Sequence, residues 1–201
     1  MVKNDTQEDI MPLSKELCKA YTAILKEELL VAMGCTEPIA IAYAAAILRH
    51  ALGAEPETIL AQLSGNIIKN VKSVIVPATG GLHGIQAAIS AGIVAACPEK
   101  ELEVLTVLTP EDQPRIAGFL TACAFTVDEM ESPHTFDLKL TGTVGDKTAA
   151  VRIAGNHTNV VSVSRNDEDL TDHYRAAVTQ EQIALTDRSV LNVRDILTFA
   201  G

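Results

Sequence analysis

Apolar positions recur with a helical period over the first quarter of the chain. Between Pro12 and Met33 they form roughly one stripe, which predicts a helix that Gly34 ends. The next segment, Thr36 to about Leu52, is apolar on nearly every face, as expected of a buried helix. Thr36 is its predicted N-cap and Gly53 its stop. Two consecutive helices therefore open the fold.

The pattern changes after Gly53. Residues 58–65 are consistent with a short strand, whereas 66–76 leave helix and strand both open. Residues 77–84 are rich in glycine and predict a loop. A helix of small residues is expected to follow it over 85–97.

Alternating positions dominate beyond Pro98. A strand is predicted over 102–108, and Thr109-Pro110-Glu111-Asp112 predicts the start of a helix that reaches about Phe125. Three further strands are predicted, over 136–143, 149–154 and 159–164, with a turn at Gly145-Asp146. Together they make a strand–helix–strand–strand–strand unit.

These elements predict an α+β fold in which small-residue helices pack with that small unit. We divide the chain into a mostly helical part (12–98), a small α+β unit (99–166), and a final part (167–201). The final part combines a solvated acidic connector, 166–172, with the start of a further amphipathic helix over 187–200.

Composition narrows the classes of function. The 201 residues carry a formal net charge of −10, and only 3% are aromatic, so we expect no nucleic-acid binding. The start of the chain is polar, and the apolar stretches 38–48 and 85–97 are too short to span a bilayer. We therefore expect a cytoplasmic protein, with no membrane partner and reduced thiols.

One cysteine stands out among the four. Cys35 lies between a helix end and a helix start, where free amide groups and the helix dipole favour a thiolate, the form that binds metal. The pattern equally allows a small core residue. The other three cysteines fit apolar helical patterns, and none forms a Cys-x-x-Cys pair that would complete a zinc site.

Three polar segments are candidates for ligand binding. In Ser64-Gly-Asn-Ile-Ile-Lys-Asn70, two amides and an ammonium would share a helical face and could bind a carboxylate, although an ordinary capped helix start with exposed polar residues also explains them. The loop around Thr79-Gly80-Gly81 precedes a helix but lacks both nucleotide-binding patterns, so a small carboxylate suits it better. His157, in a polar break between strands, could transfer a proton or be an ordinary turn residue.

Taken in order, these motifs carry a family resemblance. Three segments in this order resemble the iron–sulfur L-serine dehydratase alpha-chain superfamily: Gly34-Cys35-Thr36-Glu37-Pro38, the Ser64–Asn70 segment, and Pro77-Ala-Thr-Gly-Gly81. The similarity is greatest to its branch of L-cysteine desulfidases and the uncharacterised proteins grouped with them. It continues through Asn156-His157-Thr158-Asn159 into the last helix.

The resemblance implies a lyase that removes water or sulfide from an α-amino acid and yields pyruvate and ammonia. In such enzymes three cysteines hold a [4Fe–4S] cluster that leaves one iron open. Cys35 would then be a cluster ligand, and Lys69 or His157 would transfer the proton. The substrate pocket would be lined by Ser64, Asn66, Asn70, Thr79, Gly80 and Gly81.

One departure from the family limits this expectation. The family's other cluster cysteines lie in a helical region beyond Gly201, so we expect no intact cluster in this chain alone. A C-terminal continuation or a partner subunit would supply them. Two alternatives remain: a non-catalytic amino-acid-binding or regulatory module, and a pyridoxal-phosphate enzyme using Lys69, for which no phosphate-binding pattern is present. The substrate preference and the oligomeric state, a homo-oligomer included, stay open.

Overall fold

The computed structural model describes residues 13–29, 34–175 and 186–200. These residues form two compact units. The larger unit lies within residues 31–177, and the smaller one combines the described parts of both ends of the chain. Each unit is described by itself.

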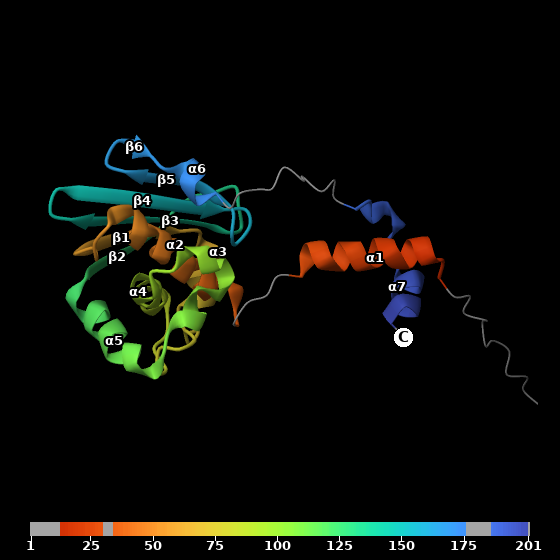
Figure 1. The fold of residues 1–201 in the computed structure, drawn as a ribbon, viewed down its shortest axis with the longest axis horizontal. Helices are drawn as coiled ribbons and strands as arrows, with labels where there is room; N and C mark the ends of the chain where they lie inside the picture. The colour runs from red at the N-terminus through yellow and green to blue at the C-terminus, as the bar shows by residue number, and fades with distance from the viewer. Residues whose placement is uncertain (1–12, 30–33, 176–185, 201) are drawn as a thin grey trace, which may run out of the picture. The chain divides into compact units, whose positions relative to one another are not determined.

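A mixed six-stranded sheet forms one layer of the larger unit (Figure 1). The strand order is β2-β1-β3-β4-β5-β6, in which β1 and β2 are parallel and every other neighbouring pair is antiparallel. The strands are β1 (Thr58–Leu63), β2 (Ala124–Glu129), β3 (Asp137–Val144), β4 (Lys147–Ala154), β5 (Val160–Arg165) and β6 (Glu168–Asp169).

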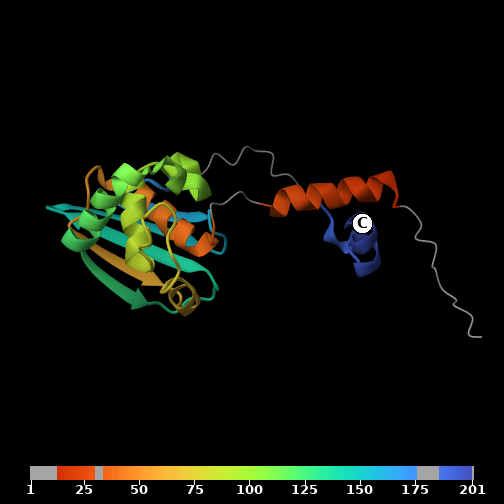
Figure 2. The ribbon, with the colours of Figure 1, turned by 90° about the horizontal axis from the view of Figure 1, so that it is seen from below.

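Helices of the larger unit cover one face of this sheet (Figure 2). They are α2 (Thr36–Leu52), α3 (Gly65–Val71), α4 (Ile85–Ala95), α5 (Gln113–Ala122) and α6 (Thr171–Tyr174), with two 3-10 segments, η1 (Pro98–Val107) and η2 (Pro110–Asp112). The parallel pair β1–β2 is joined by a long connection that carries α3, α4, η1, η2 and α5. Such a connection is what a parallel pair requires.

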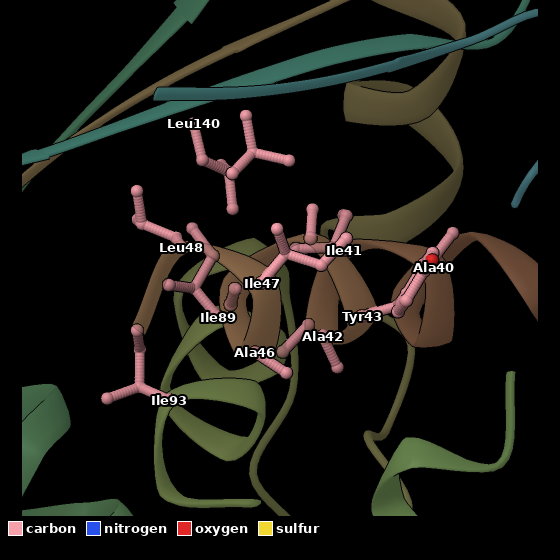
Figure 3. Close-up of a cluster of buried hydrophobic side chains, with 14 of the residues drawn as sticks. Ala40, Ile41, Ala42, Tyr43, Ala46, Ile47, Leu48, Ile89, Ile93 and Leu140 are labelled. Carbon is pink, nitrogen blue, oxygen red and sulfur yellow. The ribbon is translucent and has the colours of Figure 1, made fainter. Parts of the chain in front are cut away.

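The core lies around α2. Figure 3 shows isoleucine and leucine side chains of α2, among them Ile41 and Leu48, with Ile89 and Ile93 of α4 and Leu140 of β3. Each of these five side chains is fully buried. α2 and α4 approach so closely that a Cβ atom at Gly92 would lie 2.0 Å from the backbone oxygen of Ala42. The small residues predicted for these helices therefore permit direct backbone packing.

The smaller unit contains α1 (Lys15–Glu28), the 3-10 turn η3 (Arg188–Val190) and α7 (Val193–Ala200). The Tyr21 hydroxyl donates to the backbone oxygen of Val190, and its ring meets Phe199 edge-on at 5.4 Å. Arg188 forms ion pairs with Glu27 and Glu28. The two ends of the chain are thus tied together locally.

The structure confirms the α+β class, the buried helix that ends at Gly53, the loop over 77–84 and the three antiparallel strands with their Gly145-Asp146 turn. It resolves the ambiguous segment as α3 followed by a single β-bridge between Ile75 and His83. Cys35, one residue before the predicted Thr36, occupies the N-cap position of α2.

The strand predicted over 102–108 is wrong, because these residues belong to the 3-10 segment η1. Leu102, Val104 and Leu105 are all buried, so the run packs several neighbouring side chains into the core and cannot alternate as a half-buried strand does. The expected strand–helix–strand–strand–strand unit therefore lacks its first strand.

Other boundaries also differ from prediction. The first helix ends at Glu28, short of the predicted Met33, and residues 30–33 lie outside the described part. The helix expected to reach Phe125 ends at Ala122, and the missed strand β2 follows it. The acidic connector contains β6 and the start of α6. The boundary predicted near residue 98 falls inside the larger unit, where β1 pairs with β2 and β3.

None of the described helices is both long enough and apolar enough to cross a membrane.

Candidate functional site

The start of α2 brings together residues from four parts of the chain. The Cys35 thiol is exposed and donates a hydrogen bond to Glu37 Oε2 at 3.0 Å. Gly34 faces the glycine loop, since a Cβ atom there would lie 3.7 Å from Pro77 Cγ. The cysteine motif and the start of the loop are therefore neighbours, although Gly34 and Pro77 are 43 positions apart in the chain.

Glu37 is the centre of the cluster. Its other oxygen, Oε1, accepts a hydrogen bond from Asn70 Nδ2 of α3 at 3.3 Å. The pKa of Glu37 is lowered, first by the hydrogen bond from Cys35, then with smaller contributions from Asn70 and the charge of His157. One carboxylate thus links the cysteine, the amide of α3 and the histidine of the β4–β5 connection.

The thiol of Cys35 does not have the expected ionisation. Its pKa is raised, first by the hydrogen bond to Glu37, then by partial burial and by the negative charge of Glu37. These effects outweigh the helix N-terminus, which favours a thiolate. In this state the thiol keeps its proton and acts as a donor.

His157 is half-buried beside Phe136, with ring centroids 4.4 Å apart. Burial lowers the pKa of the imidazole, and the charge of Glu37 opposes that shift in part. The ring is therefore neutral near pH 7 and can accept a proton. It lies near enough to Glu37 for their charges to interact, so a proton acceptor is present in the neighbourhood of the thiol.

The polar residues predicted around α3 differ in their hydrogen-bond partners. Ser64 is buried, and its hydroxyl donates to the backbone oxygen of Thr135 at 2.8 Å. Asn66 and Lys69 are exposed on α3, and the structure places no hydrogen-bond partner on either side chain within its described residues. Of the predicted polar segment, Asn70 alone has a hydrogen bond to the cluster.

The glycine loop is closed on itself. The buried Thr79 hydroxyl donates to the backbone oxygens of Val76 at 2.7 Å and Leu82 at 3.3 Å. Gly80 and Gly81 have φ angles of 73° and 99°, which glycine adopts without strain. A Cβ atom at Gly80 would lie 2.7 Å from Gln113 Oε1, so this glycine packs against the start of α5. Thr79 therefore holds the loop shape and has no free hydroxyl proton for a ligand.

Sequence reasoning did not assign a role to Glu37 or to Asp137. Asp137 is fully buried and receives two hydrogen bonds from Arg152, at 2.7 and 3.0 Å, and one from Ser132 at 2.7 Å. Burial works to raise its pKa, yet the hydrogen bonds from Arg152 and Ser132 lower it overall. Asp137 thereby holds the segment before β3, which contacts Ser64 and His157. The position of Glu37, two residues after Cys35 in the first helical turn, was the available signal for its role.

The residues present do not form a complete metal centre. Within the described ranges, no group of three His, Cys, Asp or Glu side chains lies close enough to hold an ion. The Cys97 thiol donates to Glu99, which lies near His50 at the opposite end of α2, about 22 Å along the helix from Cys35. Cys35 could thus serve as a single ligand of a metal site, and the described part of the chain does not complete it.

Comparison with curated proteins found relatives known only by a family number. The chain is 42% identical over 190 residues to a UPF0597 protein of Treponema denticola, a match that covers 94% of this chain and 44% of the relative. It is 44% identical over 184 residues to a UPF0597 protein of Desulfitobacterium hafniense, covering 90% and 42%. A UPF0597 protein of Fusobacterium nucleatum is 37% identical over 177 residues, covering 88% and 41%.

The chain thus spans less than half the length of these curated relatives. No family model matches the chain. No solved structure matches it with statistical significance.

Proposed function

We propose that this chain is the N-terminal part of an iron–sulfur-dependent amino-acid lyase, which eliminates the β-substituent of L-cysteine or L-serine to give pyruvate, ammonia and sulfide or water. The observation that carries the proposal is the convergence of Cys35, Glu37, Asn70 and His157 at the start of a buried helix. All four lie in segments that resemble this family. We assign the protein to the cytoplasm, where such a cluster would be protected by reducing conditions.

The polar groups of α3 suit the binding of an amino acid. Asn70 offers an amide at the cluster, and the exposed ammonium of Lys69 is adjacent to it in the chain and attracts a carboxylate. Glu37, ionised at neutral pH, is suited to hold the substrate ammonium. Ser64, through its hydrogen bond to Thr135, positions the start of α3 and does not itself face a free partner.

Elimination also requires a base for the proton on Cα of the substrate. His157 is the better candidate because its lowered pKa leaves a neutral imidazole at pH 7. The nearby negative charge of Glu37 then stabilises the imidazolium that forms.

Cys35 would contribute one ligand to the [4Fe–4S] cluster, after its proton leaves and the hydrogen bond to Glu37 breaks. When bound, such a cluster supplies a Lewis-acidic iron for the departing hydroxyl or thiol. The further cysteines would come from a C-terminal continuation or a partner subunit. The greater length of the curated relatives is compatible with a continuation.

The test uses the complete protein in which this chain occurs, with any subunit that copurifies, prepared without oxygen and reconstituted with iron and sulfide. We expect the visible absorption of an iron–sulfur cluster and pyruvate formation from L-serine or L-cysteine. Cys35→Ser should lower both the iron content and the turnover, and Cys18→Ser, in the smaller unit, should leave both unchanged. A colourless, iron-free protein without turnover would contradict the proposal.

A second candidate is a non-catalytic amino-acid-binding or regulatory module derived from the same family. The protonated thiol of Cys35, already hydrogen-bonded to Glu37, favours it because this arrangement needs no metal. In that case the iron-free protein would bind L-serine or L-cysteine in calorimetry, and Asn70→Ala would weaken the binding. No turnover would be found in any metal-loaded sample.

A further inference from the structure

A cavity of about 360 Å³ lies at the end of α2 remote from Cys35. Its walls come from three elements of the larger unit: Tyr43 and His50 of α2, the start of η1 from Pro98 to Glu101, and the end of α6. This volume is at the small end of the range for ligand pockets, so it suits a molecule of few heavy atoms. The candidate site described above does not use any of these residues.

One wall is an ordered group of rings. His50 Nδ1 and the Tyr174 hydroxyl are 2.6 Å apart, within hydrogen-bond distance. The rings of His50 and His173 are nearly parallel, with centroids 6.3 Å apart, and both meet the Tyr174 ring edge-on. These contacts join residues 124 positions apart in the chain and fix the wall before any ligand arrives.

Two of the residues contributed by η1 are acidic. Glu99 accepts a hydrogen bond from the Cys97 thiol at 2.9 Å, which is the first cause of its lowered pKa, so its carboxylate is ionised at neutral pH. Glu101 has a φ angle of 45°, in a region that residues with a Cβ atom seldom adopt. The packing of η1 therefore holds this second carboxylate beside the cavity in spite of an unfavourable backbone conformation.

Two groups add hydrogen-bond donors. Arg175 lines the cavity, and its guanidinium also lies 3.3–3.4 Å from the backbone oxygens of Val160 and Val161. Tyr43 is 3% exposed and has no hydrogen-bond partner for its hydroxyl among the described residues. Burial, and then the charge of Glu101, raise the pKa of Tyr43 to about 12, so its hydroxyl remains a donor at neutral pH.

We propose that this cavity is a second binding site, and that its ligand is a zwitterionic α-amino acid. Glu99 and Glu101 would hold the ammonium, and Arg175 with the His50–His173 pair would hold the carboxylate. A phosphate or other dianion would be repelled by the two carboxylates. A bare metal ion fits poorly because no three ligating groups converge among the residues that the structure describes.

The test is calorimetry on the full chain, with each of the common L-amino acids as probe. At least one should bind with heat that saturates. Its deaminated and its decarboxylated analogue should each bind at least about tenfold more weakly, since each lacks one of the two charges. Glu101→Gln and Arg175→Ala should each weaken binding of the amino acid by a similar factor. Glu103→Gln, an exposed change on the same segment, is the matched control.

A second pair of variants separates this site from the proposed lyase site. Glu37→Gln and Asn70→Ala change the cluster at the start of α2 and should leave binding at the cavity unchanged. If no amino acid binds, or if binding is lost in Glu37→Gln and kept in Glu101→Gln, the second site is refuted while the lyase proposal is untouched. Absence of turnover in the complete, reconstituted protein, together with intact amino-acid binding at the cavity, would refute only the lyase proposal.

Discussion

Two thiol–carboxylate pairs of the larger unit have the same local form. In Cys35-Thr36-Glu37 and in Cys97-Pro98-Glu99 the thiol donates to the carboxylate two residues later, at 3.0 and 2.9 Å. In both pairs the hydrogen bond that the thiol donates to the glutamate is the first cause of the raised thiol pKa. Sequence and local geometry alone therefore do not distinguish them.

Their surroundings make the difference. Glu37 also accepts from Asn70 and lies near His157, whereas Glu99 faces the cavity with His50 and Glu101. The first pair meets residues of α3 and the β4–β5 connection, and the second meets α6. A Cys-x-Glu segment is thus a common local structure, and its chemical role depends on what the tertiary fold places next to it.

The largest expected effect is on stability, and it should come from a change in α4 that disturbs the packing of α4 against α2. Gly92→Ala would place a Cβ atom 2.0 Å from the Ala42 backbone oxygen, which is an impossible contact that backbone movement must relieve. We expect a loss of about 3 kcal/mol or more in the free energy of unfolding, at the upper end of overpacking effects. Urea denaturation monitored by circular dichroism measures it.

The matched control for this change is Gly118→Ala in α5, where the added Cβ atom would meet no atom within 4 Å. Alanine is the better helix former, so stability should rise by roughly 0.5–1 kcal/mol. If Gly92→Ala were as well tolerated as Gly118→Ala, the close approach of α2 and α4 would be wrong.

The next effect separates the two thiols. In Glu37→Gln the negative acceptor of Cys35 is lost, so the pKa of this thiol falls and its thiolate fraction rises. Alkylation of Cys35 by iodoacetamide at neutral pH should become about two- to fivefold faster, the range expected for an exposed charge interaction. Mass spectrometry, which reports each cysteine separately, should find the Cys97 rate unchanged.

The reciprocal variant, Glu99→Gln, should accelerate alkylation of Cys97 and leave Cys35 as it was. We expect a lower absolute rate than at Cys35 in wild type and variant alike, because Cys97 is partly covered and this limits access of the reagent. Should either variant change both thiols equally, the two pairs would be coupled through α2 and could not be treated as independent.

The smallest expected effect is a pH dependence of stability. It arises from His157, which lies near the Cys35–Glu37 pair only. Burial lowers the pKa of His157 below the ordinary imidazole value of about 6.5, so between these two pKa values the unfolded chain binds more protons than the folded one. Stability should therefore be complete above pH 6.5 and decrease as the pH falls below it. His157→Gln should flatten this dependence in thermal unfolding measured from pH 7.5 to 5, with His134→Gln, an exposed histidine, as the control.

Much of the fold could be predicted because local patterns suffice for it. The apolar run from Ile39 to Leu48 and the glycine after Leu52 predict α2 and its end, and alternation with a Gly-Asp turn predicts β3 and β4. Residues 102–108 misled the prediction, since β-favouring residues there pack as a 3-10 segment against α2. The exposed edge strand β2 has no alternating burial, and its parallel pairing with β1 is formed across more than 60 residues.

The sequence by itself determined that Cys35 lies at the start of a buried helix, and it brought the polar segment, the glycine loop and His157 into one hypothesis. Tertiary structure decided which of these residues meet. Asn70 donates to Glu37 and His157 lies near enough to interact with its charge, whereas Thr79 turns inward to hold its own loop. It also decided the charge state, because the carboxylate two residues away keeps the thiol protonated against the helix dipole. Hydrogen-bond partners and desolvation depend on neighbours distant in the chain, and a local pattern does not contain them.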